Sequence, residues 1–374
     1  MSTVKVCHLC ASTLDTSYFT SLSKGLDAKG IRTLWGSVSD QPPPSWVSRL
    51  QHSSGYFSLG AASRLHYPAA VRQLARILKC ERPDFVQTHL VYGGLIGALA
   101  SKLTGVPLIL TRHHMDDVWL GGTRFHVELD RWMARQASVV VVPSQAVYEH
   151  LYTREKLDNV RMEVIHYGFD FQAFDVEGSQ AALLRSELGL DGAFIIGCIA
   201  RLVKNKGQQF LIESLSQLVN KIPEVKLLLL GGGDTNQLQA LAQSCGVAER
   251  VVFAGHRSDV AACMKAMDVI VHPSLSEAFC QVIIEGMGVG TAMIATNVGG
   301  SKEVITDGKN GLLIPHSDPG AITGAVLKLY EDSAWRQRLA REGQLTVRRR
   351  FTVERMVGAQ VDLYQRYSQW RKAA

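Results

Sequence analysis

The chain has 374 residues, of which 46% are hydrophobic and 20% are charged, and its formal net charge is +6. This length fits two domains, and the charge is too low for a dedicated nucleic-acid-binding protein. We find neither a signal peptide nor an apolar run of about 18 residues that could span a membrane, so we expect a cytoplasmic protein.

Short β-branched runs alternate with amphipathic segments of helix length from the N-terminus onward. The first run contains C-x-x-C at Cys7–Cys10, which we interpret as buried strand cysteines because no second pair completes a zinc site. The strands predicted in the first half are VKVCHL, IRTLWG, FVQTH, PLILTR, SVVVVP and MEVIHY, with helices over 68–80, 93–103 and 124–135. Runs that are apolar throughout indicate parallel strands buried on both faces.

The alternation pauses over residues 169–192 and restarts at AFIIGCIARL, followed by KLLLLGGG, RVVFAG, DVIVHPS and TAMIATN. We therefore predict an α/β protein with two doubly wound, Rossmann-like domains, residues 1–174 and 175–350. A C-terminal helix over 351–374 is predicted to pack back on the first domain. Because ligands bind at the carboxyl ends of such strands, we expect the site in a cleft that the two domains face.

Two loops of the second half carry candidate ligand-binding residues. Arg201 and Lys206 follow a strand and precede a helix that begins near Gly207, as in a diphosphate site. Alternatively, they are two surface cations. The glycines of Gly231–Gly233 lack the third glycine of a dinucleotide-binding fingerprint, so a plain turn and a ligand contact both remain open.

The stretch PSLSEAFCQVIIEGMG places Glu277 in a loop and Glu285 eight residues later in the following helix. The helix is predicted to begin near residues 279–281. The amides of Phe279, Cys280 and Gln281 would then be unpaired first-turn donors for phosphate oxygens. Two carboxylates beside exposed amides can bind hydroxyl groups on either side of a bound phosphate, which matches a nucleotide sugar.

Together these motifs resemble glycosyltransferase family 4, the retaining enzymes of GT-B fold. The resemblance rests on the Glu-x7-Glu motif, on ARLVKNKG and on NVGGSKEVITDGKNGLLI, and covers about residues 194–330. It implies that the second domain binds the nucleotide-sugar donor and the first binds the acceptor.

The resemblance also implies roles for single residues. Arg201 and Lys206 match the cations that bind the donor diphosphate, Glu285 matches the ligand of the ribose hydroxyls, and Glu277 matches the residue that contacts the donor sugar.

Further roles are implied near the base and in the first domain. His256 and Arg257 match a loop near the nucleotide base. His113 aligns with the histidine near the donor sugar, with the adjacent His114 as the alternative.

The segment TRHHMDD, residues 111–117, raises the question of a metal. Because neighbouring side chains of an extended segment point opposite ways, we do not expect His113 and His114 to share one ion. We expect no metal and no further cofactor, and we place Asp116 and Asp117 near the acceptor.

Two features depart from the family pattern. Cys280 stands where many members have glycine, and the loop ASTLDTSYF lacks the usual Gly-Gly pair. The hydroxyl groups of Ser12, Thr13 and Thr16 are candidates to replace the missing backbone contacts.

The implied activity is transfer of a hexose from a nucleoside diphosphate to a sugar or lipid-linked acceptor. We expect a role in bacterial cell-surface polysaccharide, lipopolysaccharide or glycolipid synthesis. The alternatives are a nucleotide-sugar epimerase or hydrolase of the same fold and a non-catalytic partner subunit. Residues 335–374 hold ten Arg and Lys against three Asp and Glu. They form either a solvated helical face or a patch for the anionic inner face of the cell membrane.

Overall fold

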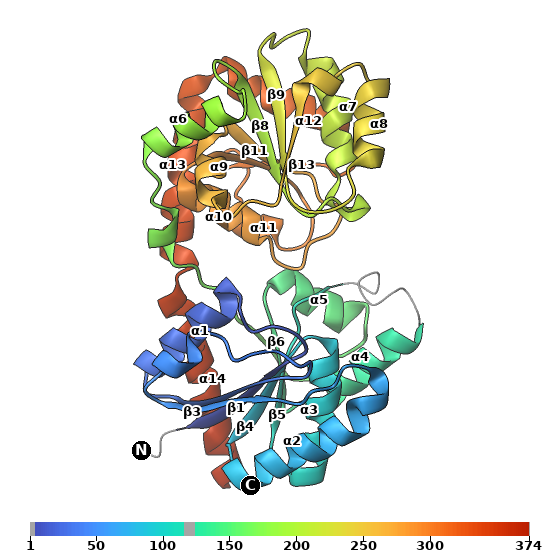
Figure 1. The fold of residues 1–374 in the computed structure, drawn as a ribbon, viewed down its shortest axis with the longest axis vertical. Coiled ribbons are helices and arrows are strands. Elements are labelled where there is room, and N and C mark those ends of the chain that lie inside the picture. Colours follow the sequence, from blue (N-terminus) through green and yellow to red (C-terminus); the bar gives the residue numbers. More distant parts are fainter. Residues whose placement is uncertain (1–3, 116–123, 374) are drawn as a thin grey trace. The chain divides into compact units, whose positions relative to one another are not determined.

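The computed structural model describes residues 4–115 and 124–373 of the chain. The chain divides into two compact units, residues 1–169 with 352–374 (unit 1) and residues 170–351 (unit 2). Each unit is built on one parallel sheet with helices on both faces (Figure 1).

Unit 1 contains a seven-stranded sheet of order β3-β2-β1-β4-β5-β6-β7. Its strands are β1 Lys5–Cys10, β2 Arg32–Ser37, β3 Ser53–Ser58, β4 Phe85–His89, β5 Leu108–Thr111, β6 Val139–Val142 and β7 Met162–Val164. Its helices are α1 Ser17–Ala28, α2 Tyr67–Glu81, α3 Val91–Thr104, α4 Arg124–Gln136, α5 Gln145–Thr153 and α14 Val353–Ala373.

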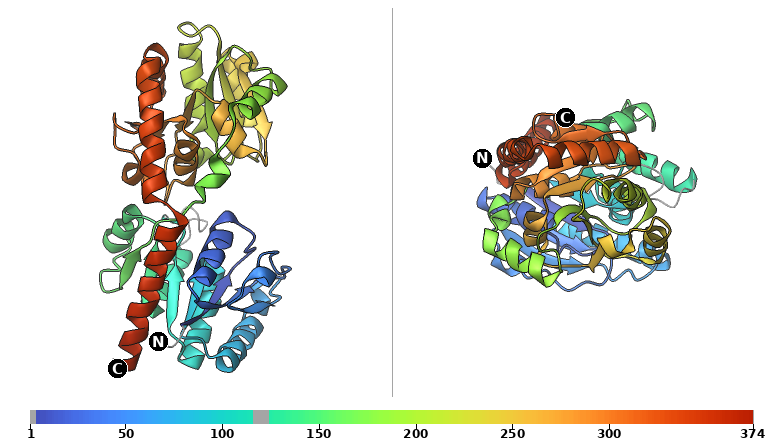
Figure 2. Two further views of the ribbon diagram at one scale, coloured as in Figure 1. Left: turned by 90° about the vertical axis from the view of Figure 1, so that its left-hand side faces the viewer. Right: turned by 90° about the horizontal axis from the view of Figure 1, so that it is seen from above.

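Two apolar layers cover the two faces of this sheet. One layer contains residues of α1 and α14, and the other contains residues of α2 and α3. The red helix α14 packs against α1, as Figures 1 and 2 show. Cys7 and Cys10 are both buried in β1 on opposite faces, which confirms the interpretation as strand cysteines.

Unit 2 contains a six-stranded sheet of order β10-β9-β8-β11-β12-β13. Its strands are β8 Phe194–Ile199, β9 Val225–Leu230, β10 Val251–Gly255, β11 Val269–His272, β12 Ala292–Thr296 and β13 Leu312–Ile314. Its helices are α6 Gly178–Glu187, α7 Gln208–Leu218, α8 Asn236–Ser244, α9 Val260–Ala266, α10 Gln281–Val289, α11 Ser301–Val304, α12 Pro319–Glu331 and α13 Ser333–Arg350.

The predicted α/β class with two doubly wound sheets is confirmed. In unit 2 the strand order reverses at β8, because β9 and β10 extend the sheet on one side and β11 to β13 extend it on the other. Such a reversal is the point where open parallel sheets bind ligands, at the carboxyl ends of the two central strands. Among the helices of the described ranges, none combines the length and the apolar character that crossing a bilayer requires.

Candidate functional site

The loops that follow β8 and β11 meet at the strand-order reversal of unit 2. The backbone amide of Leu275 donates to the carbonyl oxygen of Asn205 at 2.9 Å. Gly207 has φ of +72°, and a Cβ atom there would lie 2.1 Å from the carbonyl oxygen of Pro273. Only glycine fits such a position, so Gly207 of the NKG sequence allows the two loops to pack directly against each other.

The loop after β12 approaches Glu277 equally closely. Gly299 has φ of +49°, and a Cβ atom there would lie 1.7 Å from the carbonyl oxygen of Glu277. The amide of Gly300 also donates to this oxygen, at 3.4 Å. The backbone of Glu277 is therefore held from the side opposite the loop after β8.

A cluster of charged side chains forms where these loops meet. Lys206 Nζ lies 2.5 Å from Glu277 Oε1, and His272 Nε2 lies 2.8 Å from the same oxygen. Ser274 Oγ lies 3.1 Å from His272 Nε2. Although burial raises the pKa of Glu277, the hydrogen bond from His272 and the Lys206 ammonium lower it to about 2. Glu277 is thus held as a carboxylate in a fixed position.

His272 is the member of this cluster that the sequence analysis missed. It is the last residue of β11 and is buried, and its Nδ1 atom has no hydrogen-bond partner in the part of the chain that the structure describes. A polar residue that ends an apolar strand, just before the loop with Glu277, was the available signal. It orients Glu277 rather than facing solvent.

Helix α10 begins at Gln281, as the sequence predicts, but its first turn is less open than expected. The amide of Gln281 donates to the carbonyl oxygen of Phe279 at 3.0 Å, so the prediction of an unpaired donor is wrong at this position. This hydrogen bond closes a tight turn of three residues just before the helix. The side chains of Phe279 and Cys280 are buried, and Cys280 Sγ lies 3.2 Å from Ser301 Oγ. The thiol that replaces the expected glycine therefore packs inward.

Glu285 lies in the second turn of α10 and has a different environment from Glu277. It is half-buried, and its carboxylate forms no hydrogen bond or ion pair with another described residue. Burial raises its pKa to about 7. Its oxygens have no partner among the described residues and can therefore accept from hydroxyl groups of a ligand.

The remaining predicted residues of unit 2 lie along the same edge of the sheet. Arg201 is exposed two residues after β8, and its carbonyl oxygen accepts from Gln208 Nε2 at 2.9 Å. His256 is exposed in the loop after β10, two strands from β8. Arg257 in that loop binds Asp259 at 2.7 Å and Glu187 at 3.0 Å, and these carboxylates raise its pKa.

The glycine turn after β9 lies between these loops. The amide of Leu202 donates to the carbonyl oxygen of Gly232 at 2.9 Å, and the amide of Gly231 donates to that of Gly255 at 2.9 Å. The turn therefore connects the loop after β8 with the loop after β10.

In unit 1, His113 follows β5 and is held on both sides. Its Nε2 lies 3.2 Å from His89 Nδ1, and its Nδ1 lies 2.5 Å from the hydroxyl of Tyr167. His114 instead lies 3.0 Å from Asp130 Oδ2. The two histidines thus have separate partners, as expected for an extended segment. Residues Asp116 and Asp117 lie outside the described residues.

Two of the three hydroxyl groups proposed to replace the Gly-Gly loop, those of Thr13 and Thr16, have local partners. Thr13 Oγ1 accepts from the amide of Asp15 at 3.0 Å, and Thr16 Oγ1 caps α1 by accepting from the amide of Phe19. Their oxygen lone pairs therefore stabilise the loop before α1.

Three side chains of unit 2 have atoms suited to a metal. The ligand atoms of His272, Glu277 and Cys280 all lie within 4.8 Å of one another. However, the Lys206 ammonium already neutralises Glu277, and burial raises the pKa of the Cys280 thiol, whereas metals bind the thiolate. A divalent ion would have to displace Lys206, so these residues fit a metal poorly.

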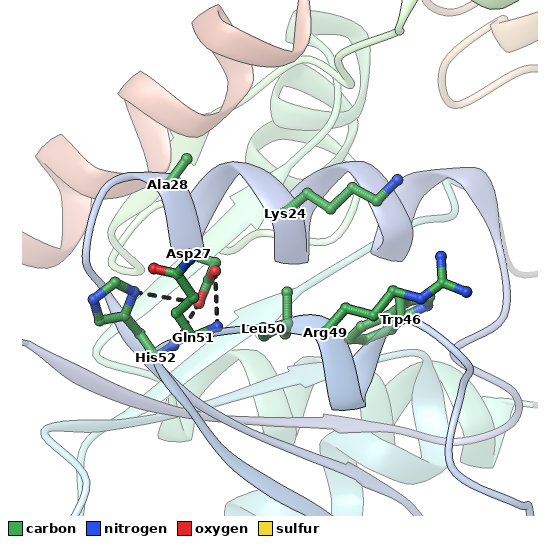
Figure 3. A pocket seen from close by; sticks show the side chains of 8 residues that line it. All are labelled: Lys24, Asp27, Ala28, Trp46, Arg49, Leu50, Gln51 and His52. Atoms are coloured by element: carbon green, nitrogen blue, oxygen red, sulfur yellow. Dashed lines mark hydrogen bonds and ion pairs between the residues drawn. The ribbon is translucent and has the colours of Figure 1, made fainter.

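A separate pocket of about 390 Å³ lies in unit 1 beside α1. Figure 3 shows Asp27 at one end, where it accepts from the amides of Gln51 and His52, with Lys24 and Arg49 toward the other. It contains none of the predicted site residues.

Comparison with known proteins covers both units. The family model "Glycosyl transferases group 1" matches residues 182–346, and "Glycosyltransferase Family 4" matches residues 16–173. A D-inositol 3-phosphate glycosyltransferase of Xylanimonas cellulosilytica is 30% identical over 311 residues, which are 78% of this chain and 73% of that protein.

Two solved structures resemble the whole chain. Anabaena Alr3699/HepE, solved with UDP and glucose, has a TM-score of 0.84 at 23% identity and covers 97% of this chain and 99% of its own. Sucrose-phosphate synthase from Thermosynechococcus elongatus has a TM-score of 0.84 at 21% identity, with 99% and 100% covered. At these identities the likeness establishes the shared fold.

Proposed function

The chain belongs to glycosyltransferase family 4 and has the GT-B fold, and from this premise we propose that it transfers a hexose from a nucleoside-diphosphate sugar to an acceptor hydroxyl with retention of anomeric configuration. The observation that carries the proposal is the cluster of Lys206, Glu277 and His272 beside the start of α10. It combines a cation, a fixed carboxylate and a helix N-terminus at the strand-order reversal.

The diphosphate is the leaving group, and positive charge stabilises it. Arg201, Lys206 and the N-terminal end of α10, at Cys280, supply that charge, so the reaction requires no metal. Lys206 exchanges part of its contact with Glu277 for a phosphate oxygen. The carboxylate of Glu277 then binds a hydroxyl group of the donor sugar.

The rest of the donor has proposed ligands in both units. Glu285 accepts from the ribose hydroxyls, and the backbone of the loop with His256 contacts the base. Arg257 supports that loop through its two carboxylate partners. His113 orients the sugar through its backbone, because both of its ring nitrogens contact protein groups. The acceptor attacks from the face of the leaving group, whose oxygen takes the acceptor proton, and no side chain acts as a nucleophile.

We propose a sugar or lipid-linked acceptor of cell-surface polysaccharide, lipopolysaccharide or glycolipid synthesis, used in the bacterial cytoplasm. Unit 1 binds the acceptor. The basic residues of 335–374 contact an anionic membrane surface at the periphery. Some of this charge is already paired, since Arg348 binds Asp175 at 2.5 Å and Arg366 binds Glu163 at 3.0 Å.

The first test is thermal unfolding of the whole chain with UDP, GDP or ADP in metal-free buffer. A nucleotide at 100 times its Kd stabilises a protein by about 2.7 kcal/mol, so one of the three should raise the Tm. The shift should vanish in Glu285→Ala and persist in Glu331→Ala, which removes an exposed carboxylate at the end of α12. No shift with any nucleotide would contradict the proposed donor site.

The second test is transfer. UDP-glucose is the first donor probe, because a related structure was solved with this molecule. Product that keeps the anomeric configuration supports a retaining transferase. Consumption of donor without any acceptor would instead favour a hydrolase or epimerase.

A further inference from the structure

Three histidines form a diagonal row across the sheet of unit 1. The strands β1, β4 and β5 are neighbours, and the register pairs Cys10 with His89 and His89 with Thr111. Because residues two apart on a strand share a face, His8 lies on the same face as His89. His113, two residues beyond Thr111, continues the row toward the carboxyl edge.

The histidine rings contact one another through ring nitrogens. His8 Nδ1 lies 3.3 Å from His89 Nε2, and His89 Nδ1 lies 3.2 Å from His113 Nε2. The row ends at two tyrosine hydroxyl groups. Tyr364 of α14 lies 3.5 Å from His8 Nε2, and Tyr167 lies 2.5 Å from His113 Nδ1.

This polar row crosses an apolar layer. Its neighbours include Trp35, whose ring stacks on His8 at 4.2 Å, and Phe19, whose edge meets His89. Apolar side chains would fill the same face without the cost of burying polar groups, which is offset only when every group is hydrogen-bonded. The row meets that condition, since each ring nitrogen of the three histidines has a partner.

The amide oxygen of Gln87 sets the direction of these hydrogen bonds. It accepts from the hydroxyl of Tyr364 and from Gln360 Nε2, and an amide oxygen cannot donate. The oxygen of Tyr364 is thereby left as an acceptor, so His8 must carry its proton on Nε2. The opposite direction would place two acceptors against each other at Gln87.

The donor and acceptor nitrogens of His8 then determine those of the neighbouring neutral rings in turn. The Nδ1 atom of His8 accepts from His89 Nε2, and the Nδ1 atom of His89 accepts from His113 Nε2. The Nδ1 atom of His113 accepts from the hydroxyl of Tyr167. Burial lowers the pKa of His8 and of His113 to about 3, which agrees with three neutral rings.

We propose that His8 and His89, with Tyr364, are positioning residues that hold His113 as a neutral ring with its proton on Nε2. The chain of bonds starts on α14 and ends beside β5, so the C-terminal helix fixes the orientation of His113. Both ring nitrogens of His113 are occupied by protein groups, and its ring cannot turn without breaking two bonds. The inference rests on the proposed function only for the role of His113 toward the donor sugar.

The test uses the whole chain labelled with ¹⁵N-histidine. NMR of the ring nitrogens distinguishes the two neutral tautomers, and loss of signals in His113→Asn identifies those of His113. Tyr364→Phe keeps the ring that stacks on Phe85 but removes the acceptor at the end of the chain. Tyr56→Phe is the matched control, because its hydroxyl contacts Ser37 and Gln41 outside the row.

We expect His113 of the wild type to carry its proton on Nε2. In Tyr364→Phe the other tautomer should become populated. The kcat with UDP-glucose should then fall by about 10- to 100-fold, which is the loss expected when a group beside the reacting atoms is displaced. Affinity for UDP should stay unchanged, because the proposed nucleotide ligands lie in unit 2. Tyr56→Phe should change neither tautomer nor kcat.

A proton on Nδ1 of His113 in the wild type would overturn the proposal. So would a Tyr364→Phe variant with the tautomer and kcat of the control. If Tyr364→Phe does not fold, His8→Phe interrupts the row of hydrogen bonds one residue closer to His113. It still places an aromatic ring against Trp35. A wild type that transfers no sugar would contradict the proposed function, while the NMR result would still decide the direction of the chain.

Discussion

At the scale of single residues, the two glutamates of the Glu-x7-Glu motif have opposite environments. Glu277 is ionised because His272 and Lys206 contact it, and its pKa is about 2. Glu285 has no such partners among the described residues, and burial raises its pKa to about 7. Paired carboxyl groups with such different pKa values suit different tasks.

Nucleotide affinity should therefore depend on the charge of Glu285. A carboxylate accepts from both ribose hydroxyls, whereas the protonated form has lost part of this capacity. With a pKa near 7, the ionised fraction rises about tenfold between pH 6 and pH 8, and affinity should rise with it. Titration calorimetry with UDP measures this. Glu285→Gln should show only the pH dependence of UDP itself, and equal slopes in both proteins would refute the assignment.

Loss of the Glu277 carboxylate should affect turnover more than nucleotide binding. In Glu277→Gln the amide keeps the volume but loses the charge that holds Lys206, and we expect kcat to fall by about 100-fold or more. The Tm shift with nucleotide should persist. Lys206→Met should instead weaken nucleotide binding, because it removes a proposed diphosphate ligand. Full transfer by Glu277→Gln would show that the carboxylate has no role.

The sequence identified part of this site and missed the rest for a physical reason. Lys206 and Glu277 lie far apart in the chain, yet they meet because carboxyl ends of neighbouring parallel strands share an edge. His8 and His89 carried no such signal. Their contact depends on the register between β1 and β4, which the sequence alone does not determine.

At the scale of elements, the central strands were predictable, whereas one edge strand of each sheet, β3 or β13, was not. Strand β3 has the polar sequence SSGYFS and lies at the edge of its sheet. None of its residues is fully buried, so it lacks the continuous apolar run by which the central strands were recognised. Strand β13 at the other sheet's edge is only three residues long. Helix α6 lies in the segment where the pattern paused and buries only Ala181 and Leu184.

The interlocked loops of unit 2 should tolerate no side chain at Gly207. In Gly207→Ala the left-handed backbone alone costs about 1–3 kcal/mol, and the contact with Pro273 adds to this. Gly324→Ala in α12 is the control, because nothing lies within 4 Å of its added Cβ atom, and it should stabilise by about 0.5–1 kcal/mol. Denaturant unfolding checks both. Equal stability of the two variants would contradict the close approach.

At the scale of the whole molecule, mild acid should affect the two units in opposite directions. In unit 1, His8 and His113 are neutral with pKa values about 3, while the unfolded chain takes up their protons near 6.5. Stability is thus complete above pH 6.5 and falls below it, by about 1.4 kcal/mol per pH unit for each histidine. In unit 2, the raised pKa of Glu285 gives the opposite sign, and stability rises as pH falls from 7 toward 4.5.

Hydrogen exchange, measured separately for each strand, tests this prediction. After correction for intrinsic rates, protection of β1, β4 and β5 should fall between pH 7 and pH 5, while that of β8 and β11 should hold or rise. His8→Phe should flatten the trend of unit 1. A uniform response of all five strands would contradict the assignment of these pKa shifts.

The C-terminal helix affects the order in which the two units fold during synthesis. Helix α14 supplies Gln360 and Tyr364 to the buried face of unit 1, whereas unit 2 is formed by one continuous segment of the chain. On the ribosome, residues 170–351 can therefore finish folding before the domain that precedes them. Unit 1, although its N-terminal part is synthesised first, can complete this buried face only after translation has passed α14.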